Sequence, residues 1–272
     1  MFSKTKCGFC SSQNKELIFD YFEPDKYEKN SFSKKKYYRA WFECLECKNF
    51  FSCNNNKVNE REFYEKVYRN KNTSFRENST EENFKKIIKL NSSESECDQR
   101  ILRIMNFKEK NDSPFKTALD IGGASGVFAY KLRKYFQKVT VLDLSEDGHF
   151  LNDYSIDYIQ DSYNSIKKKY SFVSANYVME HLSNPLDLVE SMREMIFDDG
   201  LIYIEVPSSK SFTYLEKNHD TFNSTHKFIF NPERLNFFFK RKGLEIIFIE
   251  DGLSIRGYYY LGLYCKVYKL KK

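Results

Sequence analysis

The chain has 272 residues, 41% of them hydrophobic and 17% aromatic, which is enough apolar material for one large core or two modest ones. No run approaches the roughly 20 apolar residues of a membrane helix, and no apolar signal segment opens the chain, so we expect a cytoplasmic protein without membrane insertion. The net charge of +6 comes from 44 basic and 38 acidic residues spread along the whole chain, a pattern that favours solubility over a nucleic-acid footprint.

Two Cys-x-x-Cys pairs stand near the N-terminus, Cys7 with Cys10 and Cys44 with Cys47. Four thiolates in two such pairs predict a tetrahedral, structural Zn²⁺ site. A segment this short buries little core of its own, and a bound metal supplies the missing folding free energy. Redox-active thiols are the alternative, but neither pair has the βαβ surroundings of a redox motif. Cys53 is a possible spare ligand.

Three helices are predicted after an Asn-rich break at 54–56: residues 60–68, residues 81–90 behind a Ser-Thr-Glu-Glu start signal, and residues 97–107. We expect them to connect the metal module to the main domain and to cover part of a ligand pocket. The predicted organisation is a zinc-binding ribbon-like module over 1–56, a helical linker or lid over 57–112 and the main domain over 113–272.

A strand over 118–121 runs into the small-residue turn 122–126, and a helix begins at Val127. Small residues let the backbone approach a ligand closely, and the first turn of a helix offers free N–H groups. From residue 116 onward strands and helices alternate, which predicts a parallel sheet covered on both faces. The dinucleotide fingerprint G-x-G-x-x-G fits neither Gly122 nor Gly123 as its first glycine.

The turn resembles the D-x-G-x-G-x-G signature of class I S-adenosylmethionine-dependent methyltransferases, read here as Asp120, Gly122, Ala124 and Gly126. Ala124 replaces the central glycine, and we expect it to keep an ordinary negative φ. The resemblance implies S-adenosyl-L-methionine as cofactor, with Gly123 in the same loop. It also implies an α/β fold with a Rossmann-like, seven-stranded, mostly parallel sheet.

The resemblance assigns further cofactor contacts to the ends of the next strands, predicted over 138–143, 156–161 and 170–176. Asp143, with Leu144 beside it, would accept hydrogen bonds from the ribose hydroxyls, although a helix N-cap is the alternative role for this Asp. The adenine amino group would lie near the strand that ends at 161, and the cofactor would be faced by the end of the strand over 170–176. The residues concerned are Asp161, Ser162 and Asn176.

The acceptor pocket of this class lies largely in the loop after the fifth strand, here residues 208–230. His226 is the first candidate for the catalytic base and His181 the second, because histidine titrates near neutral pH. Glu180 and His181 can equally be a structural pair at a helix start. The loop also holds Tyr214, His219 and Asn223. Around it we predict helices over 185–197 and from 231–233 to 243, a turn at 199–200 and a closing hairpin of strands over 244–250 and 258–270.

Zinc knuckles ahead of such a core resemble the C-methyltransferases of deoxysugar biosynthesis and related bacterial enzymes acting on nucleotide sugars or surface-polysaccharide precursors. Those C-methyltransferases carry a Tyr-His-Glu-His run where this chain has residues 223–226, and only His226 is kept. The resemblance therefore favours methyl transfer to a hydroxyl of a small-molecule acceptor, a sugar derivative, over C-methylation. An RNA methyltransferase that grips nucleic acid with its zinc module is the main alternative. A nicotinamide oxidoreductase and a non-catalytic binding module are further alternatives.

Overall fold

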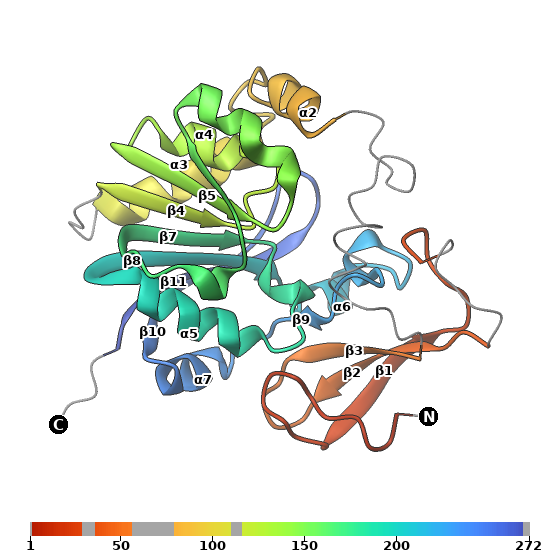
Figure 1. Ribbon diagram of the computed structural model, residues 1–272. Helices are drawn as coiled ribbons and strands as arrows, with labels where there is room; N and C mark the ends of the chain where they lie inside the picture. Colours follow the sequence, from red (N-terminus) through yellow and green to blue (C-terminus); the bar gives the residue numbers. More distant parts are fainter. Residues whose placement is uncertain (1, 29–35, 56–78, 110–115, 269–272) are drawn as a thin grey trace.

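The computed structural model describes residues 2–28, 36–55, 79–109 and 116–268 of the chain, which form two β-sheets (Figure 1). The larger sheet has seven strands in the order β10-β11-β8-β7-β4-β5-β6. Five of these strands are β4 (Thr117–Ile121), β5 (Lys138–Asp143), β6 (Asp157–Gln160), β7 (Tyr170–Asn176) and β8 (Ile196–Pro207). These five strands run parallel to one another, as predicted.

The hairpin of β10 (Leu244–Leu253) and β11 (Tyr259–Val267) adds antiparallel strands at one edge, so the sheet is mixed. Helices cover both of its faces (Figure 1). Apolar residues of α2 (Thr80–Ile87), α3 (Glu96–Glu109) and α4 (Val127–Leu132) form one buried cluster with the sheet. Ser79 caps α2 in a capping box with Glu82, as its sequence predicts. Together with the sheet these helices form the α/β layer architecture expected from the alternating elements.

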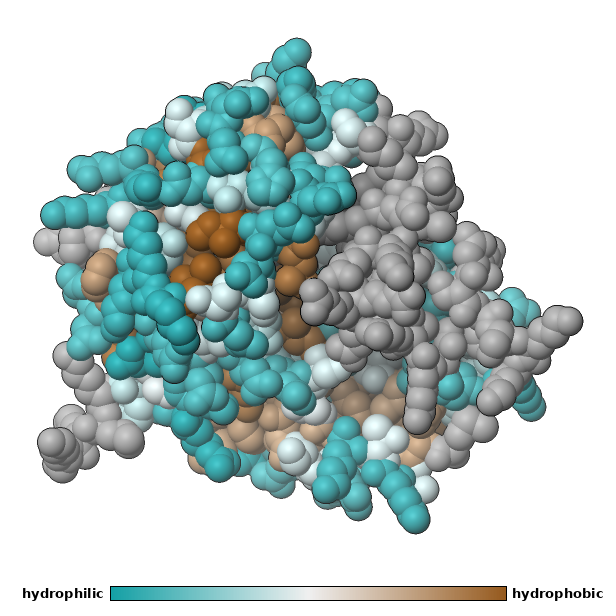
Figure 2. Space-filling view, in the orientation of Figure 1, coloured by the Kyte–Doolittle hydropathy of each residue, from teal (hydrophilic) through white to brown (hydrophobic). Residues whose placement is uncertain are grey.

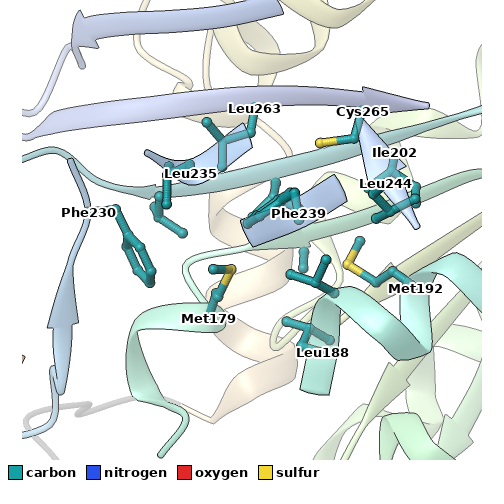
Figure 3. Packing of buried hydrophobic residues seen from close by; sticks show 14 of the residues in the cluster. Met179, Leu188, Met192, Ile202, Phe230, Leu235, Phe239, Leu244, Leu263 and Cys265 are labelled. Atoms are coloured by element: carbon teal, nitrogen blue, oxygen red, sulfur yellow. The ribbon is translucent and has the colours of Figure 1, made fainter. Parts of the chain in front are cut away.

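The opposite face of the sheet is covered by α5 (Pro185–Met195) and α7 (Leu235–Arg241). Figure 3 shows Leu188 and Met192 of α5 packed against Phe239 of α7 and Ile202 of β8. The two faces are filled by alternating residues of the same strands, as a sheet buried on both sides requires.

The helix predicted over 185–197 ends at Met195, and the turn predicted at 199–200 lies inside β8. The pairing of β7 with β8 shifts here, from Tyr170 opposite Ile196 to Phe172 opposite Leu201. The extra residues form an irregularity within the strand, where a Cβ on Gly200 would lie 2.9 Å from a backbone carbonyl oxygen of β7.

The smaller sheet consists of β1 (Lys15–Tyr21), β2 (Arg39–Cys44), β3 (Phe50–Asn54) and β9 (Phe228–Ile229), in that order. Its last strand comes from the predicted acceptor loop, which also contains α6 (Ser211–Tyr214) and the 3₁₀ helix η5 (Asp220–Phe222). The region predicted as a loop over 208–230 is thus partly regular structure, and it joins the N-terminal segment to the main sheet.

The N-terminal segment shares a buried cluster with the main domain, where the ring of Phe9 lies 5.2 Å from that of Phe238. The helix predicted over 60–68 lies outside the described residues. No helix in the described part of the chain has the length and apolar character needed to cross a membrane. The face shown in Figure 2 is largely hydrophilic, with hydrophobic residues visible in smaller areas near its middle.

Candidate active site

A cavity of about 1350 Å³ lies at the carboxyl ends of β4, β5 and β7, the usual place for a ligand in an open α/β sheet. Pockets for one small ligand measure about 300–1,000 Å³, so this cavity has room for a cofactor and an acceptor together. The predicted site residues that line it are Asp120, Gly122, Gly123, Ala124, Asp143, Leu144, Asp161, Ser162, Asn176, His181 and His226.

The turn after β4 adopts a left-handed backbone at three positions. Gly122 has φ +67°, Ala124 +49° and Gly126 +74°. The prediction that Ala124 keeps a negative φ is wrong: the chain holds an alanine in a conformation that costs an L-residue roughly 1–2 kcal/mol. Gly126 packs against Leu151 and does not belong to the cavity lining found in the described residues. Its role is to turn the chain into α4.

Asp143 holds this turn against the end of β5. Its carboxylate accepts hydrogen bonds from the backbone N–H groups of Ala124 and Ser145, each at 3.0 Å. An ionised carboxylate offers about four acceptor positions, so these bonds are compatible with further hydrogen bonds from ribose hydroxyls. The side chain that caps the following 3₁₀ helix η2 (Glu146–Tyr154) is that of Ser145, which accepts from the N–H of Asp147.

Asp120 lies under the turn with 2% of its surface exposed. Its carboxylate accepts hydrogen bonds from the hydroxyl of Ser174 at 2.8 Å and from the amide of Asn176 at 3.2 Å. Burial raises the pKa of Asp120 to about 7. The amide oxygen of Asn176 is buried without a hydrogen-bond partner among the described residues, and Asn176 lines the cavity. A ligand with a donor group would satisfy it, which fits the amino groups of S-adenosyl-L-methionine.

Glu180, His181 and His226 meet at the other part of the cavity lining. The two imidazole rings are 4.9 Å apart, centre to centre, and Nε2 of His181 is 4.0 Å from a carboxylate oxygen of Glu180. Glu180 and His181 belong to the 3₁₀ helix η4 (Met179–His181), whereas His226 comes from the loop before β9. Burial raises the pKa of Glu180 to about 8 and lowers that of His226 to about 4.

The other polar residues predicted for the acceptor loop stand outside the cavity lining of the described chain. Tyr214 is exposed and stacks on Tyr259, and Nδ1 of His219 caps η5 by accepting from a backbone N–H. The side-chain oxygen of Asn223 accepts hydrogen bonds from the backbone N–H and the hydroxyl of Thr225. The cavity is lined here by residues for which sequence reasoning made no site prediction, namely Asp220, Thr221, Arg256, Tyr258 and Tyr259.

Sequence reasoning also missed a buried ion-pair network behind the cavity. Arg100 and Arg103 of α3 both pair with Glu205 of β8, the latter at 2.9 Å. Burial would raise the pKa of Glu205, but the two guanidinium groups lower it below its ordinary value. Tyr177, next to Asn176, has φ +55° and a buried hydroxyl without a hydrogen-bond partner in the described chain. Arg100 and Tyr177 line the cavity, although no motif marks either of them.

The two cysteine pairs form one cluster, in which each thiol offers a sulfur atom within 4.8 Å of the others. Sγ of Cys7 lies 3.7 Å from that of Cys47, and Sγ of Cys10 lies 3.4 Å from that of Cys44. A tetrahedral zinc ion with bonds of about 2.3 Å holds its sulfur ligands roughly 3.8 Å apart, so the donor set fits the ion. Cys53 is not part of this cluster.

A family model described as a methyltransferase domain matches residues 91–248, more than half of the chain. The ubiquinone biosynthesis O-methyltransferase of Glaesserella parasuis serovar 5 is 24% identical over 130 residues, which are 42% of this chain and 55% of that protein. The chain thus spans about half the length of this curated relative.

Solved structures show the same fold. Magnesium protoporphyrin IX methyltransferase from Synechocystis PCC 6803, with bound S-adenosylhomocysteine, superposes with a TM-score of 0.54 and 16% identity, over 71% of this chain and 96% of that one. An S-adenosylmethionine-dependent methyltransferase from Clostridium acetobutylicum superposes with a TM-score of 0.50 and 11% identity, over 61% of this chain and 89% of that one. The chain belongs to the methyltransferase-domain family and carries a class I S-adenosylmethionine-dependent methyltransferase domain.

Proposed function

We propose that the protein transfers the methyl group of S-adenosyl-L-methionine to a hydroxyl group of a small-molecule acceptor. The observation that carries this proposal is that one cavity joins the turn after β4 to the group of Glu180, His181 and His226. The first part fits a nucleoside cofactor, and the second offers groups that can take a proton from an acceptor.

The residues assigned to the cofactor are those of the turn and of the strand ends. Asp143 would accept from the ribose hydroxyls, Asp161 and Ser162 would lie beside the adenine, and Asn176 would face the methionine part. When bound, the cofactor supplies a methyl group on a positively charged sulfur, whose C–S bond breaks as the new bond to the acceptor oxygen forms.

The acceptor hydroxyl must lose its proton as its oxygen attacks, and His226 is the first candidate to receive this proton, with His181 second. Nδ1 of His226 donates to the backbone carbonyl of Thr221 at 2.8 Å, which fixes the ring and leaves Nε2 as the basic atom. Orientation of the hydroxyl in the cavity would supply much of the rate enhancement, since the attack is in line with the bond that breaks.

We propose a nucleotide-linked sugar or a surface-polysaccharide precursor as the acceptor. The support is the cysteine cluster ahead of the catalytic domain, together with a polar acceptor lining. Asp220 and Thr221 offer acceptor and hydroxyl groups to a sugar, and Arg256 offers a cation to a phosphate.

A phenolic acceptor is the second candidate, favoured by the similarity to an O-methyltransferase of ubiquinone biosynthesis and by Tyr258 and Tyr259 in the cavity lining. Aromatic side chains pack well against an aromatic ring.

For the N-terminal residues we propose a structural zinc ion on the four clustered cysteines and a cytoplasmic location. In the described residues all cysteines are free thiols, which is typical of a reducing compartment. Elemental analysis of freshly purified protein should find about one equivalent of zinc, and substitution of Cys44 by serine should remove it.

The test of the function is incubation with methyl-labelled S-adenosyl-L-methionine and fractionated cell extract. Label should enter sugar nucleotides or polysaccharide precursors; entry into a phenolic fraction would support the second candidate, and entry into RNA would contradict both. His226→Ala should abolish transfer but keep the affinity for S-adenosylhomocysteine, whereas Asp143→Lys should lose that affinity. Unchanged binding in Asp143→Lys would overturn the cofactor assignment.

A further inference from the structure

We propose that Glu180, His181 and His226 bind a divalent transition-metal cation at the acceptor end of the cavity. The binding site itself is inferred from the geometry of these three residues. Its role in methyl transfer rests on the proposed function, which it deepens by giving the acceptor hydroxyl a cation to contact.

The three side chains converge from two separate segments. Each offers one ligand atom, and these atoms all lie within 4.8 Å of one another. Ligands at the usual 2.0–2.2 Å from a common ion are about 3–4.4 Å apart, so small side-chain adjustments close the set around an ion. Two histidines and one carboxylate are a common ligand set for divalent transition metals.

Both histidine rings are held by hydrogen bonds from Nδ1 to backbone carbonyls, as is common for histidines that bind metals. Nδ1 of His181 lies 2.9 Å from the carbonyl oxygen of Thr225, and Nδ1 of His226 lies 2.8 Å from that of Thr221. A carbonyl oxygen only accepts, so Nδ1 carries the proton in each ring. In the neutral tautomer Nε2 is then the ligand atom, the arrangement that outer hydrogen bonds commonly impose on metal-binding histidines.

The carboxylate of Glu180 gives independent support, because it is buried without hydrogen bonds in the described chain. Its side chain is fully buried, and neither carboxylate oxygen has a hydrogen-bond partner among the described residues. Burying an ionised carboxylate in this way costs several kcal/mol unless a cation or hydrogen-bond donors accompany it, and without them the group keeps its proton. A bound cation would supply that compensation, and Glu180 lines the cavity from which the cation would enter.

The ligand set indicates which cations the site would take. Two imidazole nitrogens and one carboxylate suit Mn²⁺, Fe²⁺, Co²⁺ or Zn²⁺, whereas Mg²⁺ and Ca²⁺ prefer oxygen ligands alone. The four thiolates of the N-terminal cluster suit Zn²⁺ better than Mn²⁺. Mn²⁺ is therefore the probe that separates the two sites in the zinc-loaded protein.

Three protein ligands leave further coordination positions open to the cavity. A cation there would lower the pKa of an acceptor hydroxyl that contacts it, so that the proton leaves for solvent or a nearby base at neutral pH. His181 and His226 would then act by holding the cation.

The experiment is a titration with Mn²⁺ of the full-length protein that carries one equivalent of zinc, enough for the four cysteines alone, so that zinc does not fill the second site. Binding is followed by loss of the electron paramagnetic resonance signal of the free ion. The parent protein should bind about one equivalent. Glu180→Gln and His226→Asn should each weaken binding at least tenfold, since each removes a ligand. His149→Ala, which changes an exposed histidine that hydrogen-bonds Gln160, is the matched control and should bind as the parent does.

Pulsed resonance spectra of the Mn²⁺-loaded parent should show coupling to histidine nitrogen, a readout that needs no variant to fold. Absence of binding by the parent, binding without nitrogen coupling, or equal binding by a folded Glu180→Gln variant would overturn the site. Calorimetry with S-adenosylhomocysteine runs beside the titration. A protein that binds Mn²⁺ as expected but not S-adenosylhomocysteine would refute the proposed function and leave the metal site standing.

Discussion

A Cβ atom on Gly8 would lie 2.2 Å from the backbone carbonyl oxygen of Ser183, so the first cysteine pair touches the segment that follows His181. The contact continues through the small sheet: the backbone N–H of Lys227 donates to the carbonyl of Glu180 at 2.7 Å, and that of Ser52 donates to the carbonyl of Lys227 at 2.8 Å. The N-terminal segment with the four clustered cysteines therefore supports the acceptor end of the cavity, where Glu180, His181 and His226 lie.

Substitution of Gly8 by alanine should impair the acceptor end and spare the cofactor end. The added methyl group must displace Ser183, and a displacement of about 1 Å in a catalytic group costs up to roughly 100-fold in rate. We expect kcat to fall about tenfold or more while the Kd of S-adenosylhomocysteine stays within about twofold.

The matched control for Gly8→Ala is Lys6→Ala, which changes an exposed side chain two positions before Gly8. It should leave both quantities unchanged. If Gly8→Ala weakened S-adenosylhomocysteine binding as much as it lowered kcat, the contact with Ser183 would not be specific to the acceptor end.

Substitution of Gly122 by alanine should have the opposite profile, with loss of cofactor binding. A Cβ at this position would lie 2.5 Å from Cγ2 of Val178, and the backbone is left-handed with φ +67°. The turn must move to accommodate the methyl group. A loss of about 1.4 kcal/mol in binding corresponds to a tenfold weaker Kd, and we expect at least this for S-adenosylhomocysteine by calorimetry.

Gly243→Ala is the control for backbone strain. Gly243 has φ +79°, but its Cβ would lie no closer than 3.4 Å to Arg193, and it does not line the cavity found in the described chain. Gly243→Ala should lose the roughly 1–2 kcal/mol of stability that a left-handed backbone costs an alanine, and it should bind S-adenosylhomocysteine as the parent does. Parent-like binding by Gly122→Ala would show that the turn tolerates a side chain there.

Most parallel strands of the main sheet could be predicted from the sequence because they are short, apolar runs bounded by polar residues. Lys138–Asp143 is such a run, and its predicted limits agree with β5. Its terminal Asp143 lies at the same end of the sheet as Asp120, because parallel strands end there together, and both residues line the cavity. Their contacts with the cofactor stay predictions.

The acceptor end depends on contacts between distant segments, which no local pattern contains. Phe228 and Ile229 form β9 only because β3 offers an edge with which they can pair. Glu180 and His226 come together where Lys227, the residue after His226, donates its backbone N–H to the carbonyl of Glu180. Arg100 meets Glu205 across 105 positions of the chain. The prediction of a negative φ for Ala124 was wrong for another reason. The surrounding turn imposes the backbone conformation of this residue, and a sequence does not reveal strain of this kind.

Substitution of Glu205 by glutamine should strongly destabilise the protein. Glu205 is fully buried and pairs with Arg100 and Arg103. Removal of its charge takes the carboxylate away from the buried Arg100, whereas Arg103 keeps its second pair with Glu250 at 3.2 Å. Breaking a buried pair in this way costs about 3–5 kcal/mol in the free energy of unfolding. Urea denaturation of the variant and the parent measures this difference in the free energy of unfolding. Glu81→Gln, which breaks the exposed pair of Glu81 and Lys85, should leave the transition nearly unchanged. Equal effects would refute the importance of the buried network.

Asp120→Asn should gain stability over the parent as pH rises. The ordinary pKa of Asp120 is 3.8 and burial raises it to about 7 in the folded protein, so between these values the folded state binds more protons than the unfolded state. The stability of the parent therefore falls as pH rises through this window, by at most about 4 kcal/mol at 1.36 kcal/mol per pKa unit. Asparagine does not titrate, yet its oxygen can still accept from Ser174 and Asn176.

The measurement is the difference in free energy of unfolding between Asp120→Asn and the parent, from urea denaturation of the cofactor-free proteins at pH 5 and pH 8. This difference should move in favour of the variant at pH 8, because only the parent then carries a buried charge at this position. Asp157→Asn, which changes an exposed carboxylate paired with Lys138, should show no comparable change with pH. A difference for Asp120→Asn that stays constant between the two pH values would mean that the buried carboxylate is already ionised at pH 5, held by Ser174, Asn176 and the charge of Arg100.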